Sequence, residues 1–304
     1  MDGDQGLITQ PPLTGAVPAP RNGAGRRASR WLHTKPRTRL VSLVGAPTVW
    51  LLVLYIGSLA ALFLNAAYRL KEDGSGIDHV LSTDNLRELG KTVYRDVAIR
   101  TVLIALAVTA IDVLLALPIA FYMAKLAKRR WQGVLVAAVL VPLWASYLVK
   151  AFAWRALLGS PGGVLDKTFG GSPGYGLTAL ILVLAYLWLP YMIVPIYAGL
   201  ERLPNSMLEA SSDLGARFGF TFRNVVLPLL VPSIVAGSVF TFSLSLGDYI
   251  AVDLVGGKTQ VIGSVVYDFF ASNLPLASAY ALVPVAVMIV YLLSIRRSGA
   301  LDSL

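Results

Sequence analysis

The residues with the clearest capacity for chemistry in this sequence are aspartates within or beside long apolar runs. Asp112 lies in the middle of one run, while Asp248 and Asp253 follow another, with Tyr249 beside the first of them. A charge at mid-membrane depth costs roughly 2.5–3.5 kcal/mol on insertion scales, so such residues usually face the interior of a helix bundle. Two roles stay open for Asp112: a hydrogen bond between helices, or contact with a solute.

The sequence patterns of enzymes and metal sites are absent. Cysteine does not occur, and the two histidines, His33 and His79, lie far apart. Gly257-Lys258-Thr259 looks like the end of a phosphate-binding loop, but Val252 stands where that loop requires its first glycine. We therefore expect no catalytic residue, no metal site and no cofactor held by this chain.

The composition indicates an integral membrane protein. Of 304 residues, 56% are hydrophobic and 14% are charged, against roughly 25% charged residues in soluble domains. The mean hydropathy is +0.67. The length suits one membrane domain, which we place at 41–304, after a disordered basic tail at 1–40 that has no apolar periodicity.

Six apolar runs are each long enough for a spanning helix of about 20 residues. They lie at 43–67, 98–122, 133–158, 177–200, 224–247 and 276–295. Prolines inside most of them predict kinked helices, because neighbouring helices can satisfy the backbone groups that proline frees. The fold class predicted is all-α, a polytopic membrane protein with six transmembrane helices.

The distribution of basic residues predicts the orientation. One set of connections, which includes both termini and the loop at 201–223, holds sixteen Lys and Arg residues, and the other set holds seven. Cytoplasmic loops carry the excess of Lys and Arg. Both termini and the 201–223 loop are therefore expected in the cytoplasm, and the positive net charge requires no nucleic-acid partner.

The 201–223 loop has its own helical signals. Ser206 and Glu209 fit a capping box, an amphipathic stripe of spacing i, i+3, i+4, i+7 runs from Met207 to Leu214, and Gly215 is suited to end the helix in a left-handed conformation. Two interpretations stay open on geometry alone: a plain connector, or a surface that a partner grips.

A longer pattern in this loop resembles a known family. Glu209-Ala210-Ser211, Gly215 four residues further on, and after nine more residues Val225-x-Leu227-Pro228, are similar to the EAA loop of permease subunits in binding-protein-dependent ABC importers. Ser211 and Val225 stand where Ala and Ile are usual. The resemblance covers about 50–295 and implies the type I importer permease fold.

The resemblance also implies a role and partners. In that family the loop carries a coupling helix that sits in a groove of the cytoplasmic ATPase and transmits ATP-driven closure to the membrane helices. The residues implied in coupling are Glu209, Ala210, Ser211, Asp213, Leu214, Gly215, Arg217 and Phe218. The implied partners are two ATPase copies that hold ATP and Mg, a second homologous permease in a heterodimer, and an extracytoplasmic binding protein that docks on outer loops including 249–274.

Two further segments are similar to spermidine/putrescine-type permeases. One runs from Pro142 to Trp154, with Lys150 where Arg is common. The other runs from Ser245 to Gly257, with Val252 in place of the usual proline. The Gly-Asp-Tyr form of the second segment is typical of the first of the two permeases in such systems. The resemblance therefore implies a polyamine importer in a bacterial inner membrane.

Candidate residues for the solute pathway combine carboxylates with aromatic rings, which together bind ammonium groups. They are Asp248, Tyr249, Asp253, Trp144, Tyr147 and Trp154. Each aromatic has an alternative role at the membrane interface, and Asp248 has one as a structural partner. Other solutes stay open, namely opines, anions, ferric ion or sugars, and so does a secondary transporter, although that class should show inverted repeats that are not seen here.

Overall fold

The computed structural model describes residues 36–71, 76–159 and 162–297. The chain divides into two compact units, residues 1–59 and 60–304. The long helix α2 (Pro36–Ala67) begins in the first unit and ends in the second. Most of the predicted tail lies outside the described residues, and its last five residues, 36–40, belong to α2.

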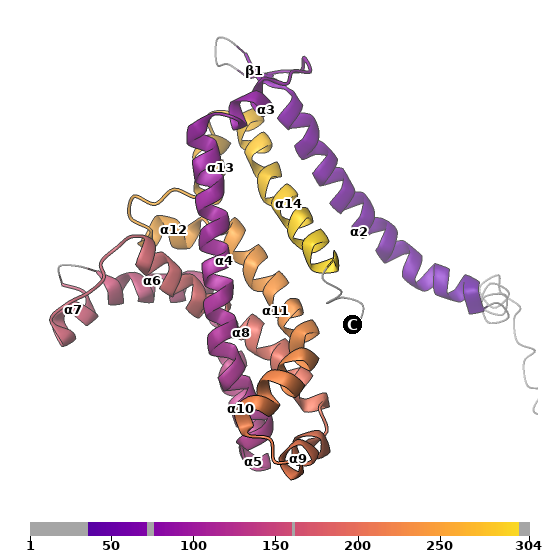
Figure 1. The fold of residues 1–304 in the computed structure, drawn as a ribbon. Coiled ribbons are helices and arrows are strands. Elements are labelled where there is room, and N and C mark those ends of the chain that lie inside the picture. The colour runs from indigo at the N-terminus through magenta and orange to yellow at the C-terminus, as the bar shows by residue number, and fades with distance from the viewer. Residues whose placement is uncertain (1–35, 72–75, 160–161, 298–304) are drawn as a thin grey trace, which may run out of the picture. The chain divides into compact units, whose positions relative to one another are not determined.

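The second unit is built almost entirely of helices (Figure 1). A short antiparallel pair, β1 (Arg69–Leu70) and β2 (Ile77–Asp78), follows α2. The first half then contains α3 (Asp84–Leu89), α4 (Thr92–Phe121), the π-helical turn η1 (Tyr122–Leu126), α5 (Arg129–Trp144), α6 (Tyr147–Leu158) and α7 (Val164–Phe169). The second half contains α8 (Leu177–Arg202), α9 (Asn205–Asp213), α10 (Phe218–Thr221), the π-helical turn η2 (Phe222–Val226), α11 (Leu227–Gly247), α12 (Ile250–Val255), α13 (Ile262–Phe270) and α14 (Leu274–Arg297).

The predicted spans are confirmed for five of the six apolar runs. Among the described residues, five helical segments are long and apolar enough to cross a membrane: 47–67, 92–126, 177–202, 218–247 and 274–297. The run at 133–158 is different, because α5 and α6 meet at an angle of 91°. The kink expected from the prolines is a complete break in this run: Ala145 and Ser146 have ψ near 139° and 134°, and both leave the helical path.

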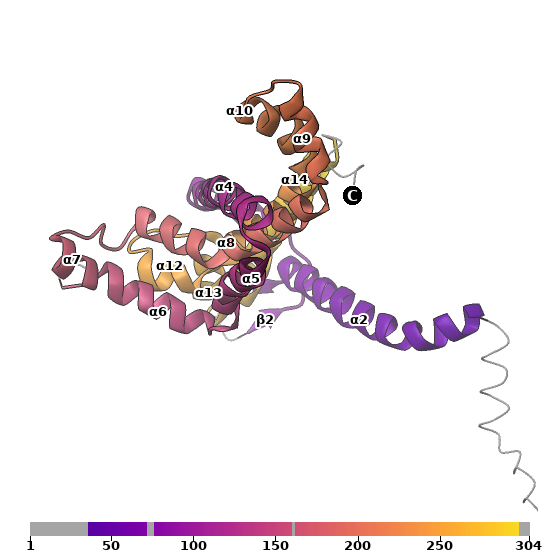
Figure 2. The same ribbon diagram turned by 90° about the horizontal axis from the view of Figure 1, so that it is seen from below.

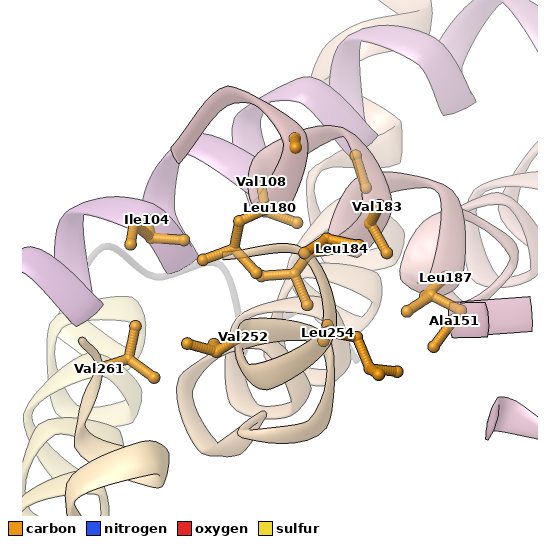
Figure 3. Close-up of a cluster of buried hydrophobic side chains, with 14 of the residues drawn as sticks. Ile104, Val108, Ala151, Leu180, Val183, Leu184, Leu187, Val252, Leu254 and Val261 are labelled. Carbon is orange, nitrogen blue, oxygen red and sulfur yellow. The ribbon is translucent and has the colours of Figure 1, made fainter. Parts of the chain in front are cut away.

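The core of this unit lies where α4, α8 and α11 pack against one another. Figure 3 shows one cluster of it, in which Val108 of α4, Leu180 and Leu184 of α8, and Val252 of α12 point toward each other. The short helices α6 and α12 close the same cluster, and Figure 2 shows them together on one side of α8.

Small residues allow α8 and α11 to approach closely. A Cβ added at Gly237 of α11 would lie 2.7 Å from the sulfur of Met192 in α8. A Cβ added at Gly199 of α8 would lie 2.9 Å from the Cβ of Ser233 in α11. Ser233 and Gly237, four residues apart on α11, therefore lie at the close contact with α8, as is typical of small residues between membrane helices.

Candidate functional site: an exposed loop helix and an aromatic pocket

Helix α9 ends as the sequence predicts. Gly215 has a φ of +79°, which a residue with a side chain adopts at a cost of about 1–2 kcal/mol. Its N–H donates to the carbonyl of Ser212 at 2.8 Å, and the N–H of Ala216 donates to the carbonyl of Ser211 at 3.1 Å. This pair of bonds is a Schellman motif, which satisfies carbonyls at the helix end.

The start of α9 differs from the predicted capping box. The helix begins at Asn205 after Pro204, and no side chain caps it. Pro204 occupies the N-cap position, with a φ of −68° and a ψ of 140°, and its side chain carries no group that could accept a capping hydrogen bond. The capping prediction for Ser206 and Glu209 is wrong, and the Glu209 side chain is left exposed, with no ion pair to any described residue.

One stripe of α9 lines an open concavity of about 750 Å³. The four stripe positions named from the sequence all belong to it, together with neighbours from the following turn and η2: Met207, Ala210, Ser211, Leu214, Gly215, Ala216, Arg217, Phe220 and Val225. Leu214 is 89% exposed and Phe218 is 67% exposed. Both large apolar side chains therefore lie open on this loop.

Three sets of contacts hold α9 and the following helix α10 against the rest of the bundle. The Lys125 ammonium, at the end of η1, donates to the carbonyl of Leu203 at 2.6 Å and to Oδ1 of Asn205 at 3.1 Å. The hydroxyls of Ser211 in α9 and Thr221 in α10 lie 2.8 Å apart.

The third set is aromatic. The ring of Phe121 in α4 lies 5.5 Å from that of Phe218 and 5.8 Å from that of Phe222, edge to face in both cases. The loop is thus attached to α4 as well as to its sequence neighbours α8 and α11. Both π-helical turns, η1 and η2, lie at this same end (Figure 1), and such turns are frequent at functional sites.

The far end of α11 carries the second feature, a buried carboxylate. Asp248 is 8% exposed. Its Oδ1 accepts the N–H of Ala251 at 2.9 Å, and the hydroxyl oxygen of Tyr147 lies 2.8 Å and 2.6 Å from its two oxygens. Burial raises the pKa of Asp248 above its ordinary value, and these hydrogen bonds oppose the rise.

A pocket of about 310 Å³ opens beside this carboxylate. Its walls come from α6, α8, α11 and the start of α12: Tyr147, Trp188, Ser243, Leu244, Gly247, Asp248, Tyr249 and Ile250. The rings of Tyr147 and Trp188 stack, with centroids 5.9 Å apart and planes at 25°. We call this the Asp248 pocket.

A second pocket, of about 400 Å³, lies on the other side of Tyr249. It contains Asp253, Lys258 and Asp268. Tyr249 lines both pockets, and its ring stacks on that of Tyr267 at 4.9 Å. Asp248 and Asp253, which the sequence places close together, therefore face different spaces.

The sequence of the membrane part is similar to a known protein family. Residues 111–300 match the family profile of the binding-protein-dependent transport system inner membrane component. The chain belongs to this family. It is a permease subunit of an ABC importer, a multi-pass protein of the inner membrane, and its role is transport rather than covalent catalysis.

Two relatives illustrate the similarity of the permease to curated proteins. The inner membrane ABC transporter permease protein YdcU of Escherichia coli K12 is 40% identical over 304 aligned residues, which cover 93% of this chain and 97% of that protein. The spermidine/putrescine transport system permease protein PotB of the same strain is 28% identical over 274 residues, covering 86% and 97%.

Solved structures show the same fold. A bacterial ABC transporter that imports the acidic polysaccharide alginate matches with a TM-score of 0.66 at 16% identity, covering 89% of the permease and 98% of that chain. The MetNI methionine ABC transporter matches with a TM-score of 0.51 at 17% identity, covering 70% and 99%. The predicted type I importer permease fold is confirmed.

The structure brings together three of the six pathway candidates of the permease. Tyr147, Asp248 and Tyr249 line the Asp248 pocket. Trp144 lies at the break between α5 and α6 and is 92% exposed, and Trp154 packs on the core with its ring 5.3 Å from that of Tyr186. Neither tryptophan lines the Asp248 pocket or the Asp253 pocket.

Sequence reasoning missed several residues at these sites. Lys125 and Thr221 bond to α9, Phe121 packs on Phe218 of α10, and Trp188 forms a wall of the Asp248 pocket. Each lies far along the chain from its partner or within a uniformly apolar run, where periodicity carries no signal. Asp112 is fully buried in α4, and neither of its carboxylate oxygens has a hydrogen-bond partner among the described residues.

Proposed function

We propose that this permease imports polyamines that an extracytoplasmic binding protein delivers. The support is the run of spermidine/putrescine permeases among its relatives, PotB of Escherichia coli and of Salmonella typhimurium at 28% and 29% identity over 86% of the chain. The printed name of YdcU, the relative at 40% identity, carries no solute. The buried carboxylate and stacked rings of the Asp248 pocket suit an ammonium solute.

We further propose that two copies of a cytoplasmic ATPase, which hold ATP and Mg, serve the importer and that α9 binds to the ATPase. A second, homologous permease completes a heterodimer. The observation that carries this part is the exposed stripe of α9. This helix ends in a Schellman turn, Lys125 of η1 bonds to its first residue, Asn205, and Phe121 of α4 packs on Phe218 in the following helix α10. A grip on α9 therefore moves α4 and α11 as well as α8.

Both termini and α9 face the cytoplasm in this proposal. The support is the excess of Lys and Arg in the connections on that side, sixteen against seven. Solute then enters at the end of α11 that carries Asp248 and leaves at the end that carries α9. Alternating access follows from ATP-driven closure of the ATPase pair and its reversal after hydrolysis.

Uptake into proteoliposomes tests the solute. The complete importer, with both permeases, the ATPase and the binding protein, is supplied with ATP inside and radiolabelled putrescine or spermidine outside. We expect ATP-dependent uptake that unlabelled polyamine suppresses and that sulfate, iron(III) citrate, an opine or a sugar does not. ATP-dependent uptake of one of those competitors without polyamine uptake would overturn the polyamine assignment.

Two substitutions in the loop test the coupling role. Gly215→Leu forces a side chain into a positive φ, and Glu209→Ala removes an exposed carboxylate without disturbing a bond inside the chain. We expect both to lower solute transport and solute-stimulated ATP hydrolysis together, while the four proteins still reach the membrane. Normal rates of both activities in the two variants would reject the role of α9.

A further inference from the structure

The Asp248 pocket presents aromatic rings from three separate elements. Tyr147 comes from α6, Trp188 from α8, and Tyr249 from the link between α11 and α12. The other lining residues add one hydroxyl, that of Ser243, and otherwise apolar atoms or backbone. A space of about 310 Å³ accommodates one end of an alkyl chain with its polar head.

The charge in this pocket is not balanced. Asp248 accepts hydrogen bonds from Tyr147 and from the backbone of Ala251, and both donors are neutral. Among the described residues, ion pairs join only Arg69 with Asp84 and Lys91 with Glu88. A buried carboxylate without a counter-ion is costly, so a cation that enters the pocket is stabilised there.

Trp188 contributes its ring to this pocket and not a hydrogen-bond acceptor. Its Nε1 is a donor only, and it is buried without a hydrogen-bond partner in the described part of the chain. Its ring centre lies 6.0 Å from that of Tyr191, and the ring centre of Tyr191 lies 6.4 Å from that of Phe240. Aromatic faces attract cations within about 6 Å of the ring centre, and tryptophan does so best.

We propose that Trp188, with Tyr147 and Tyr249, forms a subsite over Asp248 that holds one primary ammonium group of the solute during passage. This inference rests on the proposed function as a polyamine importer and adds to it a selectivity residue, Trp188, and a place for the cation. The solute class is a linear alkylammonium: the carboxylate takes the charge, and the rings cover the group and the first methylenes.

The neighbouring pocket lacks the same imbalance. Lys258 lines it together with Asp253 and Asp268, so its two acids already have a cation in the same space. It also contains no tryptophan among its lining residues. The Asp248 pocket is therefore the better fit for a desolvated ammonium group.

Substitution of Trp188 in the complete importer tests the subsite. Uptake of radiolabelled putrescine is measured in proteoliposomes at saturating binding protein, alongside ATP hydrolysis, for Trp188→Phe and Trp188→Leu. A lost cation–π contact predicts a fall in uptake of about 2- to 30-fold for Leu and a smaller fall for Phe. ATP hydrolysis stimulated by the loaded binding protein stays near the wild-type rate.

Trp131→Leu is the matched control, because Trp131 is half exposed in α5 and lines neither pocket. The subsite is supported if uptake falls in the order wild type, Trp188→Phe, Trp188→Leu while Trp131→Leu takes up putrescine like wild type. Unchanged uptake in both Trp188 variants, or a parallel loss of uptake and ATP hydrolysis, overturns it while the polyamine function stands. A wild-type importer that takes up neither putrescine nor spermidine overturns the proposed function itself.

Discussion

Gly199 of α8 and Ser233 of α11 show at the scale of single residues how closely two helices of the permease approach. The missing side chain at Gly199 is replaced in space by the side chain of Ser233. Gly133 of α5 is a useful contrast, because a Cβ added there meets no atom within 4 Å. The same substitution therefore has opposite consequences at two helical glycines.

We expect Gly199→Ala to destabilise the permease by about 1–3 kcal/mol, as overpacking does, and Gly133→Ala to stabilise it by about 0.5–1 kcal/mol through helix propensity. Thermal unfolding in detergent measures both. The double variant Gly199→Ala/Ser233→Gly moves the small residue from α8 to α11 and should recover most of the loss. A Gly199→Ala protein as stable as wild type would contradict the packing described.

The charge of the Asp248 carboxylate depends on pH. Burial raises its pKa, and the Tyr147 hydroxyl stabilises the charged form, which opposes the rise. In Tyr147→Phe that donor is lost, so the pKa of Asp248 rises further. The carboxylate then loses its charge at a higher pH as the solution is acidified.

The acid limb of putrescine uptake should therefore shift to higher pH in Tyr147→Phe than in wild type. Asp248→Asn, which keeps a side-chain oxygen to accept the N–H of Ala251, should lower uptake with assembly intact and lack this limb. Uptake against external pH in proteoliposomes measures both variants. Identical acid midpoints in wild type and Tyr147→Phe, or unchanged uptake in Asp248→Asn, would reject a charged Asp248 in transport.

At the scale of elements, α9 is held by a lysine from a distant part of the chain. Lys125 lies at the end of η1 and bonds to the carbonyl of Leu203 and the side chain of Asn205, on either side of Pro204. A net hydrogen bond contributes about 0.5–1.5 kcal/mol. The link contributes little to the free energy of unfolding, but it connects the start of α9 with η1, which directly follows α4.

Lys125→Met keeps the alkyl stem and removes both bonds. We expect about a two- to tenfold fall in solute transported per ATP hydrolysed, because α4 follows α9 less faithfully, and Lys125→Arg should restore part of it. Lys128→Met is the control, since Lys128 is exposed and its side chain makes no hydrogen bond in the described residues. Equal coupling ratios in Lys125→Met and wild type would show that this link does not contribute to coupling.

The sequence was sufficient for the helices and for the loop, but not for the contacts between them. Gly215 predicts the end of α9 because the turn that it forms depends only on neighbouring residues. The apolar runs predict the long helices because a membrane span depends only on a continuous stretch of sequence. The partners of Ser211 and Asp248, namely Thr221 and Tyr147, lie 10 and 101 residues away. No local pattern encodes such pairs.

At the scale of the whole molecule, the absence of cysteine makes the proposed orientation directly testable. Ser206→Cys in α9 and Ser272→Cys between α13 and α14 each introduce a single exposed thiol. We expect a membrane-impermeant maleimide to label Ser272→Cys in intact spheroplasts, and Ser206→Cys only in inverted vesicles stripped of peripheral proteins. The reverse pattern would place both termini outside.

The break after α5 has a consequence for bilayer thickness. Sixteen residues at about 1.5 Å each give a helix about 24 Å long, whereas the hydrocarbon layer is about 30 Å thick. The non-helical backbone at Ala145 and Ser146, which this chain leaves exposed, therefore falls within the hydrophobic layer if α5 starts at its edge. Lipid does not tolerate bare peptide groups at that depth, so the break must face either another protein subunit or water. Either way, this part of the chain is shielded from lipid in the assembled importer.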